Sequence, residues 1–159
     1  MNRQERRRHD ALVRQEVSRR KHLPVVNRRC GECTACCTIL AVADTLGKGA
    51  YEKCKHDSGR CNIYETKPEP CSTFRCLWHV GGLETDQRPD MFGVMIDVSG
   101  PGQLGPVPVI WELFEGAAES PGVQALIEKW NSVQQPVIVA YKDRRRIIGA
   151  KEDVQIDLA

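Results

Sequence analysis

All eight cysteines of this 159-residue chain fall within one stretch of forty-seven residues. They are Cys30, Cys33, Cys36, Cys37, Cys54, Cys61, Cys71 and Cys76. Cysteines that act only as small apolar core residues would be spread over every apolar segment. The C-terminal half, which carries most of the strand-like patterns, contains none. This clustering predicts that residues 30–76 form a site that depends on sulfur.

Disulfides, metal ligation and a redox-active thiol all use clustered cysteines. Disulfides persist mainly in exported proteins, which begin with a leader that contains an apolar run of about 7–15 residues. Residues 1–29 contain no such run, and no stretch of the chain is apolar for long enough to span a membrane. We therefore expect a cytoplasmic protein without a membrane segment, in which a bound metal protects the thiols from oxidation.

The charge of the chain is unevenly distributed. The net charge is +2, but residues 1–29 carry +7 and the remainder −5. Residues 2–21 contain no glycine or proline and are rich in Arg, Gln and Glu, which predicts a basic N-terminal helix that Pro24 ends. Such a charged run usually forms a solvated helix, and we favour this interpretation. Contact of residues 1–29 with an acidic partner or nucleic acid is the alternative.

Three segments follow from composition. We expect a basic helical arm over 1–27, a Cys-rich metal-binding segment over 28–80 and a small α+β domain over 81–159 that packs with it. Glycine and proline interrupt the middle segment so often that its ligands, and not a core, should determine its path.

Alternating and helical apolar patterns outline the third segment. The expected elements are strands over 92–98 and 107–114, a helix that starts at Ser120-Pro121 and ends before Pro136, and strands over 137–141, 146–148 and 154–156. The Ser120 hydroxyl is the expected N-cap, and Pro121 suits the first helical position. This order predicts an α+β fold in which one helix covers a small antiparallel sheet.

The first four cysteines have metal-ligand spacing. Two successive two-residue gaps place Cys30, Cys33 and Cys36 around one centre, as in the cysteine runs of ferredoxins, and Gly31 relieves the tight first bend. We expect Cys37 to point away from Cys36, toward a second metal or a structural pocket. Together with Cys54, Cys61, Cys71 and Cys76 as single ligands on loops, the eight thiolates suffice for two four-coordinate sites.

The spacing leaves the metal open. Zinc and iron–sulfur clusters both accept four cysteines, and the triple run favours an iron–sulfur cluster slightly over Zn²⁺. His56 and His79 follow cysteines closely. His56 is interpreted equally well as a ligand or as a surface histidine, whereas for His79 the surface histidine is at least as good an interpretation; we retain His56 as a candidate ligand. Tyr64, Phe74 and Trp78 flank the cysteines and should form an apolar shell that excludes water.

The cysteine string, with the segments Cys61–Tyr64 and Lys67–Trp78, resembles the CxxCxxCC (YkgJ-like) family, described as a zinc- or iron-chelating domain. All eight cysteine positions match the family pattern. Lys67 and Ser72 stand where that pattern commonly has arginine, which removes two guanidinium groups near the site. The likeness covers residues 28–98 most closely.

This resemblance implies metal chelation and no particular reaction, so whether the protein is an enzyme stays open. One relative of the family is flagellin lysine N-methylase, which makes a metal-dependent enzyme related to protein methyltransferases one alternative. The chain has no G-x-G-x-x-G after a strand, which weakens that alternative. A nucleic-acid or ribosome-associated binder that acts through residues 1–29 is the other.

Overall fold

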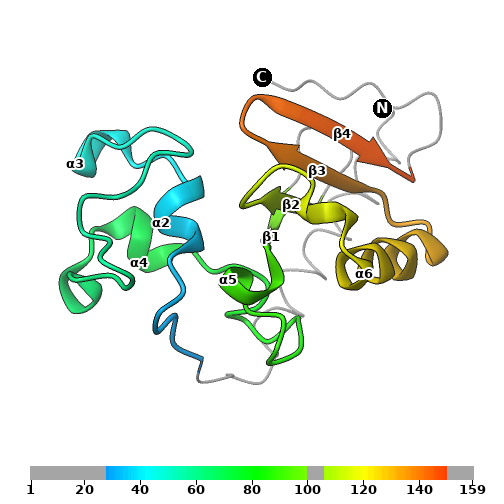
Figure 1. Ribbon diagram of the computed structural model, residues 1–159, viewed down its shortest axis with the longest axis horizontal. Coiled ribbons are helices and arrows are strands. Elements are labelled where there is room, and N and C mark those ends of the chain that lie inside the picture. Colours follow the sequence, from blue (N-terminus) through cyan, green and yellow to red (C-terminus); the bar gives the residue numbers. More distant parts are fainter. Residues whose placement is uncertain (1–27, 100–105, 150–159) are drawn as a thin grey trace, which may run out of the picture.

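The computed structural model describes residues 28–99 and 106–149. The Cys-rich segment and a four-stranded sheet with one long helix lie side by side (Figure 1). The predicted N-terminal arm over 1–27, the loop around residues 100–102 and the last predicted strand over 154–156 lie outside the described residues. In the part that the structure describes, every helix is too short or too polar to cross a membrane.

Short helices joined by turns make up the Cys-rich segment and its connection to the sheet. They are α2 (Ala35–Ile39), α3 (Ala43–Leu46), η1 (Tyr64–Thr66), α4 (Glu69–Thr73) and α5 (Pro89–Phe92). Gly47, with φ +60°, ends α3 in the left-handed region, and Gly93 ends α5 with φ +80°. Frequent glycine and proline therefore keep each helix to one turn or little more, as the irregular composition predicts.

The sheet runs in the order β1-β2-β3-β4, with β1 at Val94–Ser99, β2 at Val107–Glu112, β3 at Val137–Tyr141 and β4 at Arg144–Ile148. The outer pairs are antiparallel, but β2 and β3 are parallel. The sheet is therefore mixed, and the prediction of an antiparallel sheet is wrong at this central pair. The physical reason is α6 (Pro121–Ser132), which returns the chain to the end of the sheet where β2 began. The coarser α+β class holds.

Helix α6 covers one face of the sheet. Ile96, Ile110 and Val139 point to this face from β1, β2 and β3 and are buried with Val123 and Ile127 of the helix. The helix begins at Pro121 with Ser120 at the N-cap position, as predicted, but the Ser120 hydroxyl makes no capping hydrogen bond. The alternation of side chains along β1 then leaves Met95 on the opposite face.

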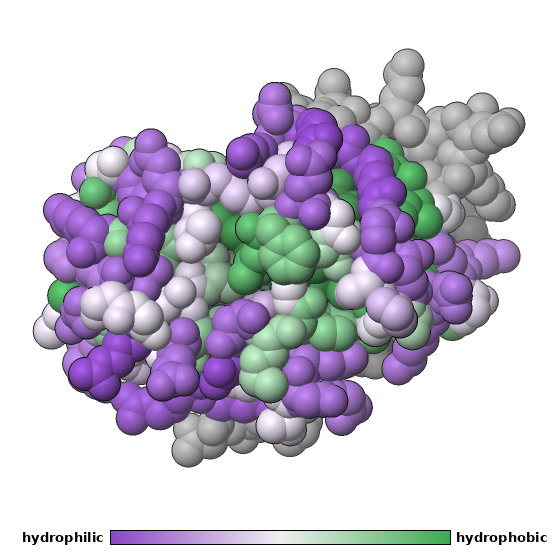
Figure 2. Space-filling view, viewed as in Figure 1, coloured by the Kyte–Doolittle hydropathy of each residue, from purple (hydrophilic) through white to green (hydrophobic). Residues whose placement is uncertain are grey.

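The Cys-rich segment packs against that opposite face. Met95 is buried against Ala35 and Ile39 of α2. The Tyr51 hydroxyl donates a hydrogen bond to the Glu112 carbonyl oxygen (3.1 Å), and a backbone bond from Leu77 to Ile96 (2.7 Å) joins the two parts again. Hydrophobic residues gather at the middle of the face shown in Figure 2, between the more hydrophilic surfaces on either side. The sheet thus supports the part of the Cys-rich segment that carries α2.

Candidate metal centre

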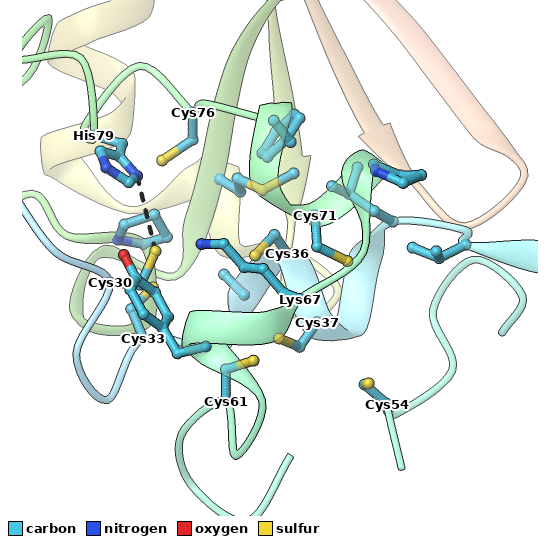
Figure 3. A pocket seen from close by; sticks show the side chains of 18 of the residues that line it. Cys30, Cys33, Cys36, Cys37, Cys54, Cys61, Lys67, Cys71, Cys76 and His79 are labelled. Atoms are coloured by element: carbon cyan, nitrogen blue, oxygen red, sulfur yellow. Dashed lines mark hydrogen bonds between the residues drawn. The ribbon is translucent and has the colours of Figure 1, made fainter. Parts of the chain in front are cut away.

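All eight cysteines line one cavity of about 160 Å³, and none forms a disulfide. Segments far apart in sequence supply them: the turn before α2, α2 itself, the loops around residues 54 and 61, α4, and the loop that follows α4 (Figure 3). Seven are half-buried, and Cys54 is buried at 7 % exposure. The structure therefore places the complete set of predicted thiols around one cavity.

The turn from Cys30 to Cys33 has the expected tight geometry. The Cys33 N–H donates to the Cys30 carbonyl oxygen (2.9 Å), and Gly31 adopts φ +58°. A residue with a Cβ would be strained at that φ, so glycine permits the turn. The chain then enters α2, which carries Cys36 and Cys37 and rests on the sheet through Ala35 and Ile39.

Cys36 and Cys37 do not diverge as expected from their adjacency. Both line the cavity, and the thiol of Cys37 lies close enough to be the leading cause of a raised pKa at Cys36, ahead of burial. The reason is that these residues are helical, so their side chains are separated by about 100° around the axis and not by the half turn of a strand. Side chains that point in these two directions from α2 both reach the cavity.

Local backbone hydrogen bonds hold the later cysteines. Cys54 donates from its N–H to the Cys37 carbonyl oxygen (3.1 Å), and Cys71 donates to the Pro68 carbonyl oxygen (3.0 Å) at the start of α4. Cys61 is fixed by an isolated β-bridge to Asp57. These bonds connect loops that have no extended core of their own.

Of the two candidate histidines, His79 lines the cavity and His56 is not among the residues that do. The Nδ1 atom of His79 lies 3.8 Å from the Cys30 sulfur (Figure 3). Burial lowers the pKa of His79, and the charges of Arg75 and Lys67 lower it further, so the ring is neutral at physiological pH. Neutral imidazole is the form that binds metals.

Burial raises the pKa of four thiols as the leading cause. It raises that of Cys33 to about 12, and it is also the leading cause of the raised pKa values of Cys30, Cys71 and Cys76. A thiol in this environment keeps its proton at physiological pH unless a metal displaces it. Asp90 approaches Cys33 from outside the cavity; burial acts to raise the pKa of Asp90, but Arg88 outweighs this and lowers it.

The donor set suits a thiophilic metal, although the thiols border the cavity without converging. Within residues 28–99 and 106–149, no group of three or more Cys, His, Asp or Glu side chains is arranged so that it could hold a metal ion. No carboxylate belongs to the described lining of the cavity, whose remaining side chains are mostly apolar. Such a lining disfavours hard cations, which take oxygen ligands, and matches the preference of zinc and iron for sulfur.

The aromatic residues expected around the site lie there. Tyr64, Phe74 and Trp78 all line the cavity. Trp78 is 7 % exposed, and its Nε1 donates to the Thr85 carbonyl oxygen (3.1 Å), which fixes the indole as one wall. These rings limit the access of water to the sulfurs.

No sequence pattern identified two cationic residues of the cavity as functional groups. Lys48 and Lys67 both line it. Lys67 was visible only as a departure from the family pattern, and Lys48 stands between two glycines in a stretch with no recognisable motif. Their proximity to the thiols arises from tertiary structure.

No family model, curated protein or solved structure matches the chain. The resemblance to the CxxCxxCC family thus stays an interpretation of the cysteine spacing, and the geometry of the cavity carries the functional argument.

Proposed function

We propose that this protein binds a thiophilic metal, either zinc or iron in an iron–sulfur cluster, through its eight cysteines. The observation that carries the proposal is the common cavity: eight thiols from six parts of the Cys-rich segment line it, and no described carboxylate does. A cytoplasmic location, where thiols stay reduced, agrees with this use of cysteine.

Metal binding should be coupled to rearrangement of the segment. Burial favours the neutral thiol at Cys33, and the thiols stand apart in the metal-free arrangement, so binding must displace protons and draw sulfurs together. Structural zinc contributes about 10–16 kcal/mol in small cysteine-rich peptides, which is comparable to the whole stability of a domain. That free energy is large enough to close the cavity around a metal.

Anaerobic purification of the full chain, followed by elemental analysis and a visible absorption spectrum, tests the proposal. A brown sample that contains iron and sulfide identifies a cluster, and a colourless sample that contains zinc identifies a zinc protein. Protein that takes up neither metal under reducing conditions would contradict the proposal.

Serine variants then test which sulfurs act. Simultaneous replacement of Cys30, Cys33 and Cys36 by serine removes the turn and helix thiols and should lower the metal content per chain. Single replacement of Cys61 should lower affinity less, because seven thiols remain. Unchanged metal content in the triple variant would remove these residues from the site.

Limited proteolysis tests the coupling to structure. Chelator treatment should open new cleavage sites between Arg28 and Trp78, while β1–β4 and α6, which have their own apolar core, stay protected. An identical cleavage pattern with and without metal would show that the metal does not organise this segment.

A further inference from the structure

Lys48 is a buried cation beside the thiols. It is 5 % exposed and lines the cavity. Its ammonium group donates to the carbonyl oxygens of Thr38 (3.0 Å) and Gly49 (3.0 Å), and also to that of Leu40 at the C-terminal end of α2. Among the described residues, no carboxylate oxygen lies within ion-pair distance of its Nζ.

A buried charge without a counter-ion is costly, because transfer from water is not compensated by attraction. Burial lowers the pKa of Lys48, and the groups that act most strongly in the opposite direction are the thiols of Cys54 and Cys37, followed by Glu52. Glu52 is exposed and accepts a hydrogen bond from the Gly49 N–H (2.6 Å). Among the residues that line the cavity, the cysteine sulfurs are therefore the groups that can supply negative charge to Lys48 once a metal has displaced their protons.

Lys67 approaches the sulfurs from another side. Its ammonium lies 3.8 Å from the centroid of the Tyr64 ring, and its side chain extends into the cavity (Figure 3). Its charge acts on Cys30, Cys36 and Cys71, whereas Lys48 acts on Cys36, Cys37 and Cys54. The two lysines thus line the same cavity, and Cys36 interacts with the charges of both.

We infer that the thiols form a net anionic metal–thiolate centre whose charge is partly balanced by Lys48 and Lys67. This inference rests on the proposed metal binding and adds the charge of the centre and the residues that stabilise it. Four thiolates on one divalent zinc ion leave a net charge of about −2, so eight thiolates in two such sites carry about −4, of which two ammonium groups offset half. In a cavity with mostly apolar walls, such charge pairing is screened less than at the surface.

Lys67 is the better residue to test. Replacement of Lys48 would also remove the hydrogen bonds to three backbone carbonyls, so a loss of binding could reflect local unfolding. Lys67→Met removes the charge and keeps an apolar chain of similar length over Tyr64, and Lys67→Arg keeps the charge. Lys129→Met, on the exposed side of α6, is the matched control for loss of one positive charge.

The full chain is stripped of metal under anaerobic reducing conditions, and its affinity for Zn²⁺ is measured by competition with a chelator. Lys67→Met should weaken Zn²⁺ binding by about 10- to 100-fold, the usual range for residues that support metal ligands. Lys67→Arg should restore affinity to within a few-fold, and Lys129→Met should match wild type. Thiolate-to-metal absorption of the Co²⁺ form should keep its intensity per bound ion in Lys67→Met, since the ligands are unchanged.

Failure of the metal-binding proposal and failure of the charge-balancing inference give different results. Wild-type protein that binds neither Zn²⁺ nor Co²⁺, and that also contains no iron when purified anaerobically, would contradict the metal-binding function itself. Wild-type protein that binds Zn²⁺ tightly, with Lys67→Met equal to Lys129→Met, would leave the function intact and overturn the charge-balancing role. Weakened binding that Lys67→Arg does not restore would likewise assign Lys67 a packing role and overturn the inference.

Discussion

The Cys30 sulfur and the His79 Nδ1 atom lie 3.8 Å apart, although the two residues are separated by 49 positions in the chain. This contact joins the first and last parts of the Cys-rich segment at the edge of the thiol cavity. It places a neutral imidazole where it can bind a metal directly or orient the thiolate of Cys30.

Replacement of His79 by alanine should therefore weaken metal binding by about 10- to 100-fold. His56→Ala is the matched variant, because His56 is also half-buried and close to cysteines but does not belong to the described lining of the cavity. Zn²⁺ affinity measured by chelator competition compares the two. A larger loss in His56→Ala would instead support His56 as the ligand.

Arg28 should stabilise the folded state of the Cys-rich segment. Its Nη1 donates to the carbonyl oxygens of Trp78 (2.7 Å) and Leu83 (2.8 Å), and its guanidinium lies 5.0 Å from the centroid of the Trp78 ring. Arg28→Ala should lower the free energy of unfolding by about 2–3 kcal/mol, since hydrogen bonds from charged groups are lost beside a buried indole. Urea unfolding monitored by tryptophan fluorescence measures the change.

Arg29 provides the control for Arg28. Its side chain and that of its partner Glu65 are both mostly exposed, and such surface ion pairs contribute about 0–1 kcal/mol. Arg29→Ala should thus change the free energy of unfolding by less than Arg28→Ala does. Equal effects would show that the backbone contacts of Arg28 are not stabilising.

The metal-free protein should lose stability at alkaline pH. Burial raises the folded-state pKa of Cys33 from 9.0 to about 12, so the neutral thiol is favoured by folding. This contribution is fully present below about pH 9 and is lost as the pH rises toward 12. The urea midpoint of reduced, metal-free protein should fall over that range, and the fall should be smaller in Cys33→Ala.

Metal-loaded protein should show the opposite dependence on pH. Its ligands are thiolates, so acid competes with the metal and should release it with loss of stability. A loaded protein whose urea midpoint follows the same alkaline fall as the metal-free form would argue that Cys33 is not a ligand.

Glu112 should stabilise the turn that leads into α6. The side chain is buried at 7 % exposure, and its Oε1 accepts a hydrogen bond from the Ala118 N–H (2.8 Å), which is itself buried. Glu112→Ala leaves that N–H without its partner and should cost about 1–3 kcal/mol in unfolding free energy. Glu112→Gln keeps an oxygen acceptor and should cost less; equal costs would contradict the hydrogen-bond explanation.

Local sequence patterns predicted the secondary structure of the C-terminal part closely. The predicted strand over 137–141 coincides with β3, and α6 begins at the predicted Pro121. These features depend on apolar alternation and on the fixed φ of proline, which act over a few residues. The parallel pairing of β2 with β3 was not predicted, because pairing depends on where the crossover helix packs and leaves no local pattern.

For the site, the sequence by itself determined the donor chemistry: eight clustered thiols, a glycine at the first turn and three aromatic residues nearby. Tertiary structure decided the rest. It directed Cys37 into the same cavity as Cys36, brought His79 to Cys30, and buried Lys48 beside the sulfurs. The reason is physical: residue type fixes which atoms a side chain can bind, whereas the distance between segments depends on how α2 and its loops pack against Met95 and the sheet.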